Sequence, residues 1–568
     1  MPHLSLTQQR WATKPSDAAR VSALAQSLDI SPILAQCLIH RATTDRVHEW
    51  LEPSPEHLHD PMLMSGMSQA VARVRQAIEG AENVRLVTDY DVDGTTSCLI
   101  LRSTLLLLQA SGRIDHHIPD RQHEGYGFSL RAAEQAIADG VNLLITADIG
   151  VRDHEAVSAA AAGGVDVIIC DHHLPAGAQV PADALAVLCP PQVDCSYPNP
   201  ALAACGVSLK LAEALLNDHH PKAQAILISM LKVAAIGTVA DVVDLSTPEN
   251  RAIVALGVEE LRRGPHTAGL QALLDVADVG AEATAEDLGF KLGPRINAAG
   301  RLAQADAVLT LLSCRDRAEA RRQAEALDTL NRDRQGIQRT LVKECLSRLS
   351  DPPPGFVVLW GEEAEGWHRG VVGIVAAKVR DKVHRPAAVI AVAGEDARGS
   401  VRAPPGVHAV RALDSVSDLL LAHGGHPAAA GFSARAADLP EISRRLDAYV
   451  QTHTADDDLV PTLQVEATCT PSDLGPDLAQ ALSKLAPFGK GNPPPLLQLV
   501  GVKAEQIRPM GQGHLRMTIG GVDTVWWGGA DHRAALDGVV DIVGTLGFNH
   551  WRGRSTVRLT IKDARACP

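Results

Sequence analysis

Three aspartates stand two residues apart in the stretch VTDYDVDGTTSC, residues 87–98. Asp89, Asp91 and Asp93 follow an apolar run and precede a glycine and a hydroxyl-rich segment. Carboxylates at this spacing converge on one site when the chain leaves extended geometry, and their like charges make this unfavourable without cations. A solvated acidic turn or a calcium loop is the alternative, although an EF-hand requires a downstream Glu and flanking helices. Taken alone, the motif is compatible with both a catalytic metal site and an acidic turn.

Two further aspartates follow apolar segments. Asp148 ends the run in ITADIG, and Asp241 follows AAIGTVA. An Asp that ends a strand or caps the next helix is common, so Asp148 by itself indicates little. Asp241 would need a partner or a metal if it were buried, and would need neither on a helix surface.

The triplet Asp-His-His occurs three times, and its position separates the copies. Asp171, His172 and His173 follow the apolar run VDVIIC, where His can supply a nitrogen ligand to a metal and an adjacent His can bind phosphate. The copy at 218–220 follows the helical run LKLAEALLN, where His is favoured at a helix C-terminus. The copy at 115–117 lies within a predicted strand. Only the copy at 171–173 stands at the end of a strand.

The elements that position these residues alternate between strands and helices. From about residue 80 to 240, runs such as NVRLVTD, VNLLITAD and VDVIICD alternate with alanine-rich helical stretches. This alternation predicts βαβ units and a parallel sheet. Such sheets bind ligands at the carboxyl ends of their strands, and the three strand-end aspartates fall there.

The rest of the chain divides by pattern into further domains. Arg, Glu, Ala and Leu at helical spacing predict one or two long helices before the Pro352-Pro353-Pro354 run. The strand GFVVLW opens a second α/β domain, and short alternating strands such as LRMTIGG predict a terminal β-barrel. We predict an N-terminal helical arm, a first α/β domain with the motifs above, connector helices, a second α/β domain and a terminal β-barrel domain, at 1–55, 56–300, 301–352, 353–455 and 456–568.

Composition excludes some classes of protein. The 568 residues suggest three or four domains, and a net charge of −14 argues against nonspecific coating of nucleic acid. No stretch approaches the roughly 18 apolar residues of a membrane span, and the N-terminus lacks a signal-peptide pattern. The ten cysteines are scattered without a CxxC pair, so neither a zinc knuckle nor a disulfide framework is indicated. We expect a cytoplasmic protein that does not associate with membranes.

Taken together and in this order, the motifs resemble those of the DHH phosphoesterases. The downstream segment HGGHPAAAGFS, with Gly424, Gly425 and His426, resembles the signature of the DHHA1 domain that accompanies them. The segments GPRINAAGRL and WHRGVVGIVAAKV are similar to the RecJ branch of that family, the single-stranded-DNA exonucleases. The resemblance covers essentially the whole chain. It implies an α/β fold in which long helices join a parallel-sheet DHH lobe to a smaller α/β DHHA1 lobe, followed by a C-terminal OB-like β-barrel.

The resemblance also implies two divalent cations, Mn²⁺ or Mg²⁺, bridged by Asp148. Asp89 and Asp91 would lie near one cation, and Asp93, His172 and Asp241 near the other. Related phosphoesterases place a ligand two residues before Asp89, where this chain has Val87. Carboxylate-rich ligation suits these hard ions, and Mn²⁺ readily accepts a histidine nitrogen.

The resemblance to the DHH phosphoesterases also implies catalytic roles. Asp148 and His172 belong to the catalytic set together with Asp171 and His173. Asp171 would orient the histidine pair, and His173 would contact the scissile phosphate. No covalent intermediate is implied.

Cleavage from the 5′ end to 5′-mononucleotides, which the resemblance implies, requires groups that hold a terminal phosphate and the strand behind it. Arginine forks and hydroxyl donors suit phosphate oxygens, although a single Arg is more often part of a surface salt bridge. The barrel tryptophans either stack on bases or pack in the core. The predicted substrate-binding residues are Arg121, Tyr126, Arg295, Arg301, Gln335, Ser400, Arg402 and His426.

The expected function is 5′→3′ hydrolysis of single-stranded DNA in repair and recombination, by a monomer that works with a helicase and a single-strand-binding protein. The alternative is a nanoRNA or cyclic-dinucleotide phosphodiesterase with the same metal site, although those chains lack the connector and the barrel. A DHH pyrophosphatase would lack the Gly-Gly-His signature. A non-catalytic relative would show eroded acidic motifs, whereas all of these carboxylates are present.

Overall fold

The computed structural model describes residues 4–42, 46–108, 111–119, 124–175, 177, 179–217, 219–302, 306–551 and 554–567. The chain forms two compact units. One comprises Met1–Cys37, Arg332–Leu482 and Pro495–Pro568, and the other comprises Leu38–Asn331 and Ser483–Pro494. The second, named here the metal unit, contains the aspartates and histidines singled out above.

The centre of the metal unit is a five-stranded sheet in the order β3-β2-β4-β5-β6, with all neighbouring strands parallel. Strands β2 and β4 are buried along their whole length, as expected for a parallel sheet covered on both faces. The predicted strands are therefore confirmed. Their bounds are β2 Val84–Thr88, β3 Ile114–His117, β4 Leu143–Ala147, β5 Asp166–Cys170 and β6 Ala186–Leu188.

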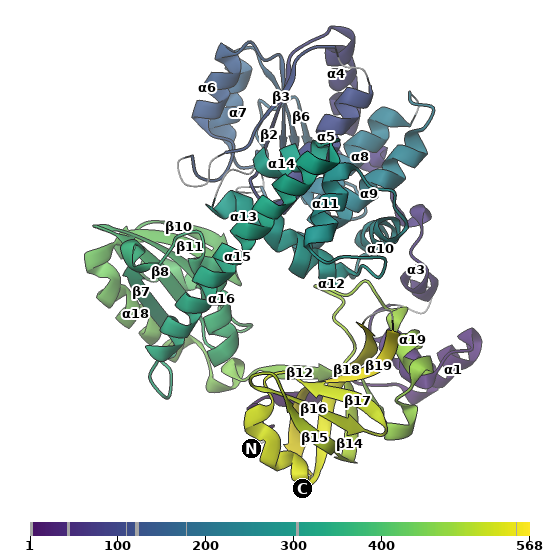
Figure 1. Ribbon diagram of the computed structural model, residues 1–568. Coiled ribbons are helices and arrows are strands. Elements are labelled where there is room, and N and C mark those ends of the chain that lie inside the picture. Colours follow the sequence, from purple (N-terminus) through teal and green to yellow (C-terminus); the bar gives the residue numbers. More distant parts are fainter. Residues whose placement is uncertain are drawn as a thin grey trace. The chain divides into compact units, whose positions relative to one another are not determined.

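Helices cover both faces of this sheet (Figure 1). One face packs against α4, α5 and α8 through Leu86, Ile145 and Ile168, and the other packs against α6 and α7 through Leu144 and Val167. The alternation of side chains along each strand explains why neighbouring residues enter different cores. The helices are α4 Met67–Glu79, α5 Val92–Leu107, α6 Leu130–Ala138, α7 His154–Ala162 and α8 Ala204–Leu216.

A helical layer continues the metal unit beyond the sheet. Helix α9 packs against α5, α8 and α10, and its length and composition alone would suffice to cross a membrane. The bent pair α1 and α2 passes that test only as one span, and buried core helices pass it as well. The layer also includes a short π-helical turn, η5. The bounds are α3 Val47–Leu51, α9 Ala223–Ala240, α10 Pro248–Arg263, α11 Ala268–Val276, α12 Ala285–Asp287, η5 Leu288–Leu292, α13 Gly293–Leu302 and α14 Asp306–Ser313.

The long helix α15, Arg317–Ser347, carries the chain from the metal unit into the other unit. The predicted connector helices are thus present as α14 and α15. Beyond them a five-stranded mixed sheet has the order β10-β11-β9-β8-β7, and the predicted strand GFVVLW, 355–360, overlaps β7. The bounds are β7 Val357–Glu362, α16 Val372–Val383, β8 Ala387–Ala393, β9 Asp396–Arg402, α17 Ala409–Asp414, β10 Leu420–His426, β11 Ala429–Arg435 and α18 Leu439–His453.

The C-terminal strands form a seven-stranded sheet in the order β13-β14-β18-β19-β17-β16-β15, and no pairing joins β13 to β15 among the residues with described placement. Side chains alternate between buried and partly exposed along β16, which fits a strand with one face in the core. The bounds are β13 Ala467–Cys469, α19 Pro476–Ser483, β14 Leu497–Lys503, β15 Glu505–Met510, β16 His514–Ile519, β17 Val522–Trp526, β18 Val539–Trp551 and β19 Arg554–Ala566.

The N-terminal segment differs in one element from the predicted helical arm. Residues Arg10–Thr13 form strand β1, which pairs in parallel with β12, Thr462–Val465. Helices α1 Ala18–Leu28 and α2 Pro32–Ile39 follow, as expected. The pairing joins residues about 450 positions apart, and such a partner leaves no local signal in the sequence.

Candidate metal centre

Three strand-end aspartates form a row along the carboxyl edge of the parallel sheet. The backbone N–H of Asp89 donates to the carbonyl of Ala147 (3.3 Å), and that of Asp148 donates to Cys170 (3.0 Å). The N–H of Asp171 donates to Leu188 (2.9 Å). Each aspartate is thereby fixed to the last residue of the next strand, so the three residues lie next to one another along this edge.

The other two aspartates of the first motif belong to helix α5. Asp91 caps this helix, and its Oδ1 accepts from the N–H groups of Asp93 (2.8 Å) and Gly94 (3.1 Å). Asp93 is buried, and its two oxygens accept from Ala204 (2.7 Å) and Cys205 (2.8 Å) at the start of α8. A helix N-terminus stabilises a carboxylate there, so α5 and α8 together hold the Asp93 side chain in place.

Asp241 reaches the same place from the end of α9. Gly237, one turn earlier, lies so close to α5 and α8 that an added Cβ would stand 2.4 Å from Thr96 Oγ1 and 2.6 Å from Cys205 Sγ. The following residue, Val242, has φ +58°, a backbone conformation unusual for a β-branched side chain. Asp148 also has a positive φ, +65°, and strained backbone of this kind clusters at functional sites.

The side chains form three groups, and within each group the potential ligand atoms lie within 4.8 Å of one another. His172 is central to them, because its Nε2 lies 3.3 Å from Asp148 Oδ1, 3.6 Å from Asp241 Oδ2 and 3.9 Å from Asp93 Oδ2. The structure thus brings together every residue that the sequence analysis nominated as a metal ligand. The groups are Asp89, Asp91 and Asp148; Asp93, His172 and Asp241; and Asp148, His172 and His173.

The electrostatics of the cluster favour bound cations. Burial raises the pKa of Asp148 and Asp241 well above the ordinary value, and the neighbouring carboxylates raise both pKa values further. Burial and the charge of Asp91 also raise the pKa of Asp93, against the effect of His172. Burial lowers the pKa of His172, so its imidazole is held neutral. Neutral imidazole beside carboxylates is the donor set that Mn²⁺ accepts.

Two buried polar atoms of the cluster lack hydrogen bonds within the described part of the chain. Asp148 Oδ1 and His172 Nε2 are buried and, among the described residues, neither has a hydrogen-bond partner. Leaving a buried carboxylate oxygen and a buried ring nitrogen unsatisfied costs about 1–3 kcal/mol each. A divalent cation between them would satisfy both, so the residues fit the metals that the sequence motifs imply.

His173 is oriented by Asp171 and Tyr126. Its Nδ1 lies 2.8 Å from Asp171 Oδ1, which also accepts from the backbone N–H of His172 (2.7 Å). Its Nε2 lies 3.3 Å from the hydroxyl of Tyr126, which also donates to the carbonyl of Asp148 (3.3 Å). Burial opposes protonation of His173, but the hydrogen bond to Asp171 and the negative charges of Asp171 and Asp93 together raise the pKa of the histidine. The same contact lowers the pKa of Asp171 although burial acts in the opposite direction.

A second polar cluster lies in the other unit, on β9. Arg402 Nη1 donates to Ser400 Oγ (3.0 Å) and to the carbonyl of Val401 (2.8 Å). Gly373, in the first turn of α16, packs against both side chains, and an added Cβ would lie 3.0 Å from Ser400 Oγ and 3.2 Å from Arg402 Nη2. A guanidinium, a hydroxyl and a helix N-terminus together favour an anion such as phosphate.

The remaining predicted substrate-binding residues have varied surroundings. Arg295 donates to Asp328 Oδ1 (3.0 Å) and to the carbonyls of Lys291 and Val276 (2.7 and 3.2 Å), so these contacts within the protein engage its guanidinium. Gln335 is partly buried on α15, and His426 is exposed at the end of β10. Arg121 and the side chain of Arg301 lie outside the described residues.

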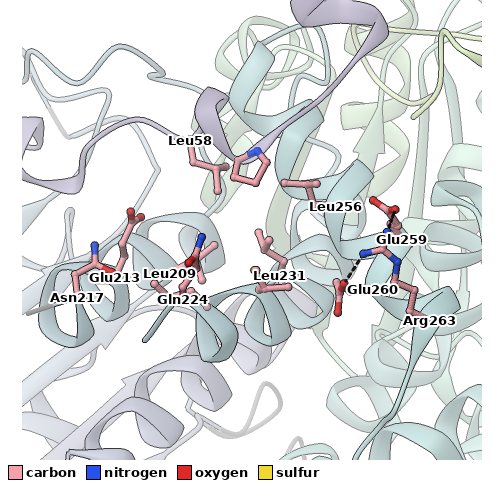
Figure 2. A pocket seen from close by; sticks show the side chains of 13 residues that line it. Leu58, Leu209, Glu213, Asn217, Gln224, Leu231, Leu256, Glu259, Glu260 and Arg263 are labelled. Carbon is pink, nitrogen blue, oxygen red and sulfur yellow. Dashed lines mark hydrogen bonds and ion pairs between the residues drawn. The ribbon is translucent and has the colours of Figure 1, made fainter. Parts of the chain in front are cut away.

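A groove with a volume of about 470 Å³ lies elsewhere in the metal unit, and no nominated residue lines it (Figure 2). Leu209, Leu231 and Leu256 form part of an apolar floor, and Arg263 makes ion pairs with Glu259 and Glu260 at one end. The sequence pattern had not indicated it.

Sequence reasoning also missed residues that shape the metal unit. Gly237 and the α8 N-terminus carry no recognisable motif, and neither does Arg251, whose side chain is fully buried. The run Pro-Phe-Gly-Lys-Gly-Asn-Pro at 487–493 is a detectable signal, because two glycines and two prolines in seven residues indicate a shaped loop.

Comparison with protein families matches three regions of the chain. The model for the DHH family, N-terminal domain, matches residues 83–238, and the DHHA1 domain matches residues 354–452. The RecJ OB domain matches residues 465–563. These regions correspond to the parallel sheet with its helices, the second α/β domain and the seven-stranded sheet.

Relatives that match nearly the whole of this chain are known. The chain is 36% identical to the single-stranded-DNA-specific exonuclease RecJ of Bacillus subtilis, over 98% of this chain and 71% of the relative. It is 33% identical to the protein of that name from Escherichia coli, over 94% of this chain and 96% of the relative. The crystal structure of Thermus thermophilus RecJ in complex with Mn²⁺ is similar, with a TM-score of 0.83, 30% identity and coverage of 98% of this chain and 79% of that one.

Proposed function

The chain belongs to the RecJ family of single-stranded-DNA-specific exonucleases, and from that premise we propose that it degrades single-stranded DNA from the 5′ end to 5′-mononucleotides. The observation that carries the proposal is the convergence of five aspartates and two histidines on the carboxyl edge of a parallel sheet. Such a cluster is typical of metal-assisted phosphoester hydrolysis. The relatives act in the same class of reaction, and a role in DNA repair and recombination is consistent with it.

Two divalent cations, Mn²⁺ or Mg²⁺, complete the site. Asp89, Asp91 and Asp148 would hold one, and Asp93, His172 and Asp241 the other, with Asp148 between them. When bound, the cations lower the pKa of the attacking water and neutralise charge on the phosphate oxygens. The protein's part is to fix the ligands through α5, α8 and the strand ends, so that little reorganisation is needed.

In this proposal, His173 binds the scissile phosphate. Asp171 accepts from Nδ1 and so directs Nε2 toward the cluster, beside the Tyr126 hydroxyl. The raised pKa of His173 favours the imidazolium, which donates a charge-assisted hydrogen bond to a phosphate oxygen. Asp171 is then a positioning residue, and Tyr126 a second donor.

Ser400 and Arg402 are assigned to the 5′-terminal phosphate. Their contact with each other and with the first turn of α16 supports this, because three kinds of anion-binding group meet there. Arg121, Arg295, Arg301, Gln335 and His426 are proposed contacts for the strand. Arg295 would have to exchange its bonds to Asp328 and two carbonyls for a phosphate, which makes it the costliest of these assignments.

An assay on 5′-labelled single-stranded, duplex and dinucleotide substrates with Mn²⁺ or Mg²⁺ tests the proposal. Mononucleotides should be released from the single strand and not from the blunt duplex. His172→Ala should abolish release, whereas His219→Ala, the middle residue of the triplet outside the site, should not change it. Faster turnover of dinucleotides than of oligomers would favour a dinucleotide phosphodiesterase. Full activity of Asp148→Asn would contradict the metal assignment.

We also propose that the protein acts as a cytoplasmic monomer and receives its substrate from a helicase and a single-strand-binding protein. Support comes from the chemistry of the substrate, since duplex DNA must be opened and single strands in cells are covered. Light scattering of the purified protein tests the monomer, and a dimer mass at low micromolar concentration would contradict it.

A further inference from the structure

A short segment of the C-terminal domain is part of the metal unit. Residues Ser483–Pro494 connect α19 to β14, and they are compact with Leu38–Asn331 rather than with the sheet on either side of them. We name this segment the strap. It contains Lys490 in the run Pro-Phe-Gly-Lys-Gly-Asn-Pro.

One end of the strap is held by a buried arginine. The guanidinium of Arg251, on α10, donates to the carbonyls of Leu485 (3.3 Å) and Ala486 (3.0 Å) and also to that of Trp50 (2.7 Å). It lies 4.2 Å from the centre of the Trp50 ring. Burying a cation beside carbonyls and an aromatic ring, with no carboxylate among its hydrogen-bond partners in the described residues, is costly, so this position is specialised for holding backbone.

The other end of the strap packs against the turn that follows Asp241. The N–H of Leu245 donates to the carbonyl of Lys490 (2.8 Å). Gly491 has φ +75°, and a Cβ there would lie 1.8 Å from Asp244 Oδ1, so only glycine fits. Asp244 Oδ1 itself accepts from Ser246 (2.7 Å). The backbone of Lys490 is therefore bound to Leu245, which is four positions after Asp241, a proposed metal ligand.

The side chain of Lys490 is available for a ligand. It is exposed, and none of the ion pairs found between described residues includes it. The carbonyl of Lys490 is bound to Leu245, in the turn after Asp241, and the charge of its side chain interacts with the Asp241 carboxylate. A lysine placed in this way is a mobile point charge at the Asp241 side of the metal centre.

We propose that Lys490 binds the internucleotide phosphate on the 3′ side of the scissile phosphate, and that the strap exists to hold it there. The inference rests on the proposed function, in which the 5′-terminal phosphate is assigned to Ser400 and Arg402 and the scissile phosphate to the metals. Along the retained strand, the first phosphate on the 3′ side is the neighbour of the scissile phosphate, so it is the strand phosphate that must lie nearest to the metal centre. A flexible ammonium group beside the metal centre suits such a phosphate, because it needs no fixed geometry.

The first test is the salt dependence of binding and of KM on a single-stranded oligonucleotide, for wild type, Lys490→Gln and Lys484→Gln. Lys484 is the matched control, since it is an exposed lysine of the same strap. Each phosphate contact contributes about 0.7 to the slope of log affinity against log salt. Lys490→Gln should reduce the slope by about 0.7, which corresponds to an affinity about eightfold lower at 50 mM salt if the curves meet near 1 M. Lys490→Arg should restore it.

The second test uses a 5′-phosphorylated dinucleotide, whose one internucleotide phosphate is the one cleaved. Wild type and Lys490→Gln should have equal kcat and KM on it, because the phosphate bound by Lys490 is missing. An unchanged salt slope in Lys490→Gln would overturn the proposal. So would an equal loss on the dinucleotide, which would place Lys490 at the metals or at the scissile phosphate. Failure of the proposed function is distinguishable, since wild type itself would then release no nucleotides from single strands.

Discussion

Protons and divalent cations compete for Asp148. Burial raises its pKa well above the ordinary value, and the charges of the neighbouring aspartates add to the effect. Between the unfolded and the folded pKa, the native state binds more protons than the unfolded chain, so metal-free protein loses stability as pH rises through that interval. Bound cations favour the ionised carboxylate and remove this loss.

We therefore expect Mn²⁺ to raise Tm more at about pH 7.5 than at about pH 5.5, because protons displace the metal at the lower pH. Thermal unfolding with and without Mn²⁺ measures the difference. Asp148→Asn lacks the titrating group, so its Tm shift should be smaller and should depend less on pH. Equal shifts of the wild type at both pH values would contradict the expectation.

The pair Asp171–His173 gives a second prediction at the level of residues. Asp171→Asn keeps the shape of the side chain but removes the charge that raises the pKa of His173. Loss of such an orienting carboxylate typically costs about 10–100-fold in activity. Because the imidazolium is the proposed donor to the phosphate, the alkaline limb of kcat/KM should also move to lower pH.

A pH–rate profile of Asp171→Asn checks this. The matched control is Asp115→Asn, the first residue of the triplet on β3, whose carboxylate is bound to Arg85 far from any proposed step. That change should lower stability without moving the profile. An Asp171→Asn profile parallel to that of the wild type would show that Asp171 does not act through His173.

At the scale of elements, helix packing determines where Asp241 lies. The Cβ of Gly237→Ala would stand 2.4 Å from Thr96 Oγ1 and 3.1 Å from Asp93 Oδ1, so α9 must move away from α5 and α8. Overpacking of this kind costs about 1–3 kcal/mol. Because Asp241 follows at the end of the helix, activity and Mn²⁺ affinity should fall together with the free energy of unfolding.

Urea unfolding and Mn²⁺ titration of Gly237→Ala measure these effects. Gly336→Ala, on α15, is the control, since an added Cβ meets nothing within 4 Å there. It should be stabilising by up to about 1 kcal/mol, because alanine is the better helix former. Unchanged Mn²⁺ affinity in Gly237→Ala would show that the packing of α9 does not determine the position of Asp241.

The elements that were predictable from sequence are those with a local signal. Each of β2, β4 and β5 is an apolar run that ends beside an aspartate, and parallel strands bring such ends to one edge. The position of one Asp-His-His copy at a strand end separated it from the other two. The fold and the family that these features and the downstream motifs predicted are confirmed.

What was not predictable depends on contacts between distant segments. The strand β1 has its partner about 450 residues away, and the N–H groups that hold Asp93 come from a helix more than 100 residues later. Periodicity carries no information about such partners. The same holds for Arg251, because nothing in the sequence distinguishes it from other helix arginines, and its role depends on the bonds of its guanidinium to the strap.

At the scale of the whole molecule, the chain leaves the metal unit inside α15 and returns to it at the strap. The boundaries predicted from composition divide the sequence into consecutive domains, whereas the compact units are interleaved along it. A fragment that ends after the second α/β domain would lack Lys490 and the backbone packed against Leu245. Activity retained by such a fragment on dinucleotides, with weakened binding of long strands, would agree with the role proposed for the strap.

The strap has a consequence for the order of events on the ribosome. The metal unit lacks its last piece until residues 332–482 have been synthesised, a stretch of 151 residues between Asn331 and Ser483. At about 5–20 residues per second, this leaves the carbonyl-binding face of Arg251 and the Asp241 turn uncovered for about 8–30 s. The metal unit is therefore completed late in translation, when most of the chain has already been synthesised.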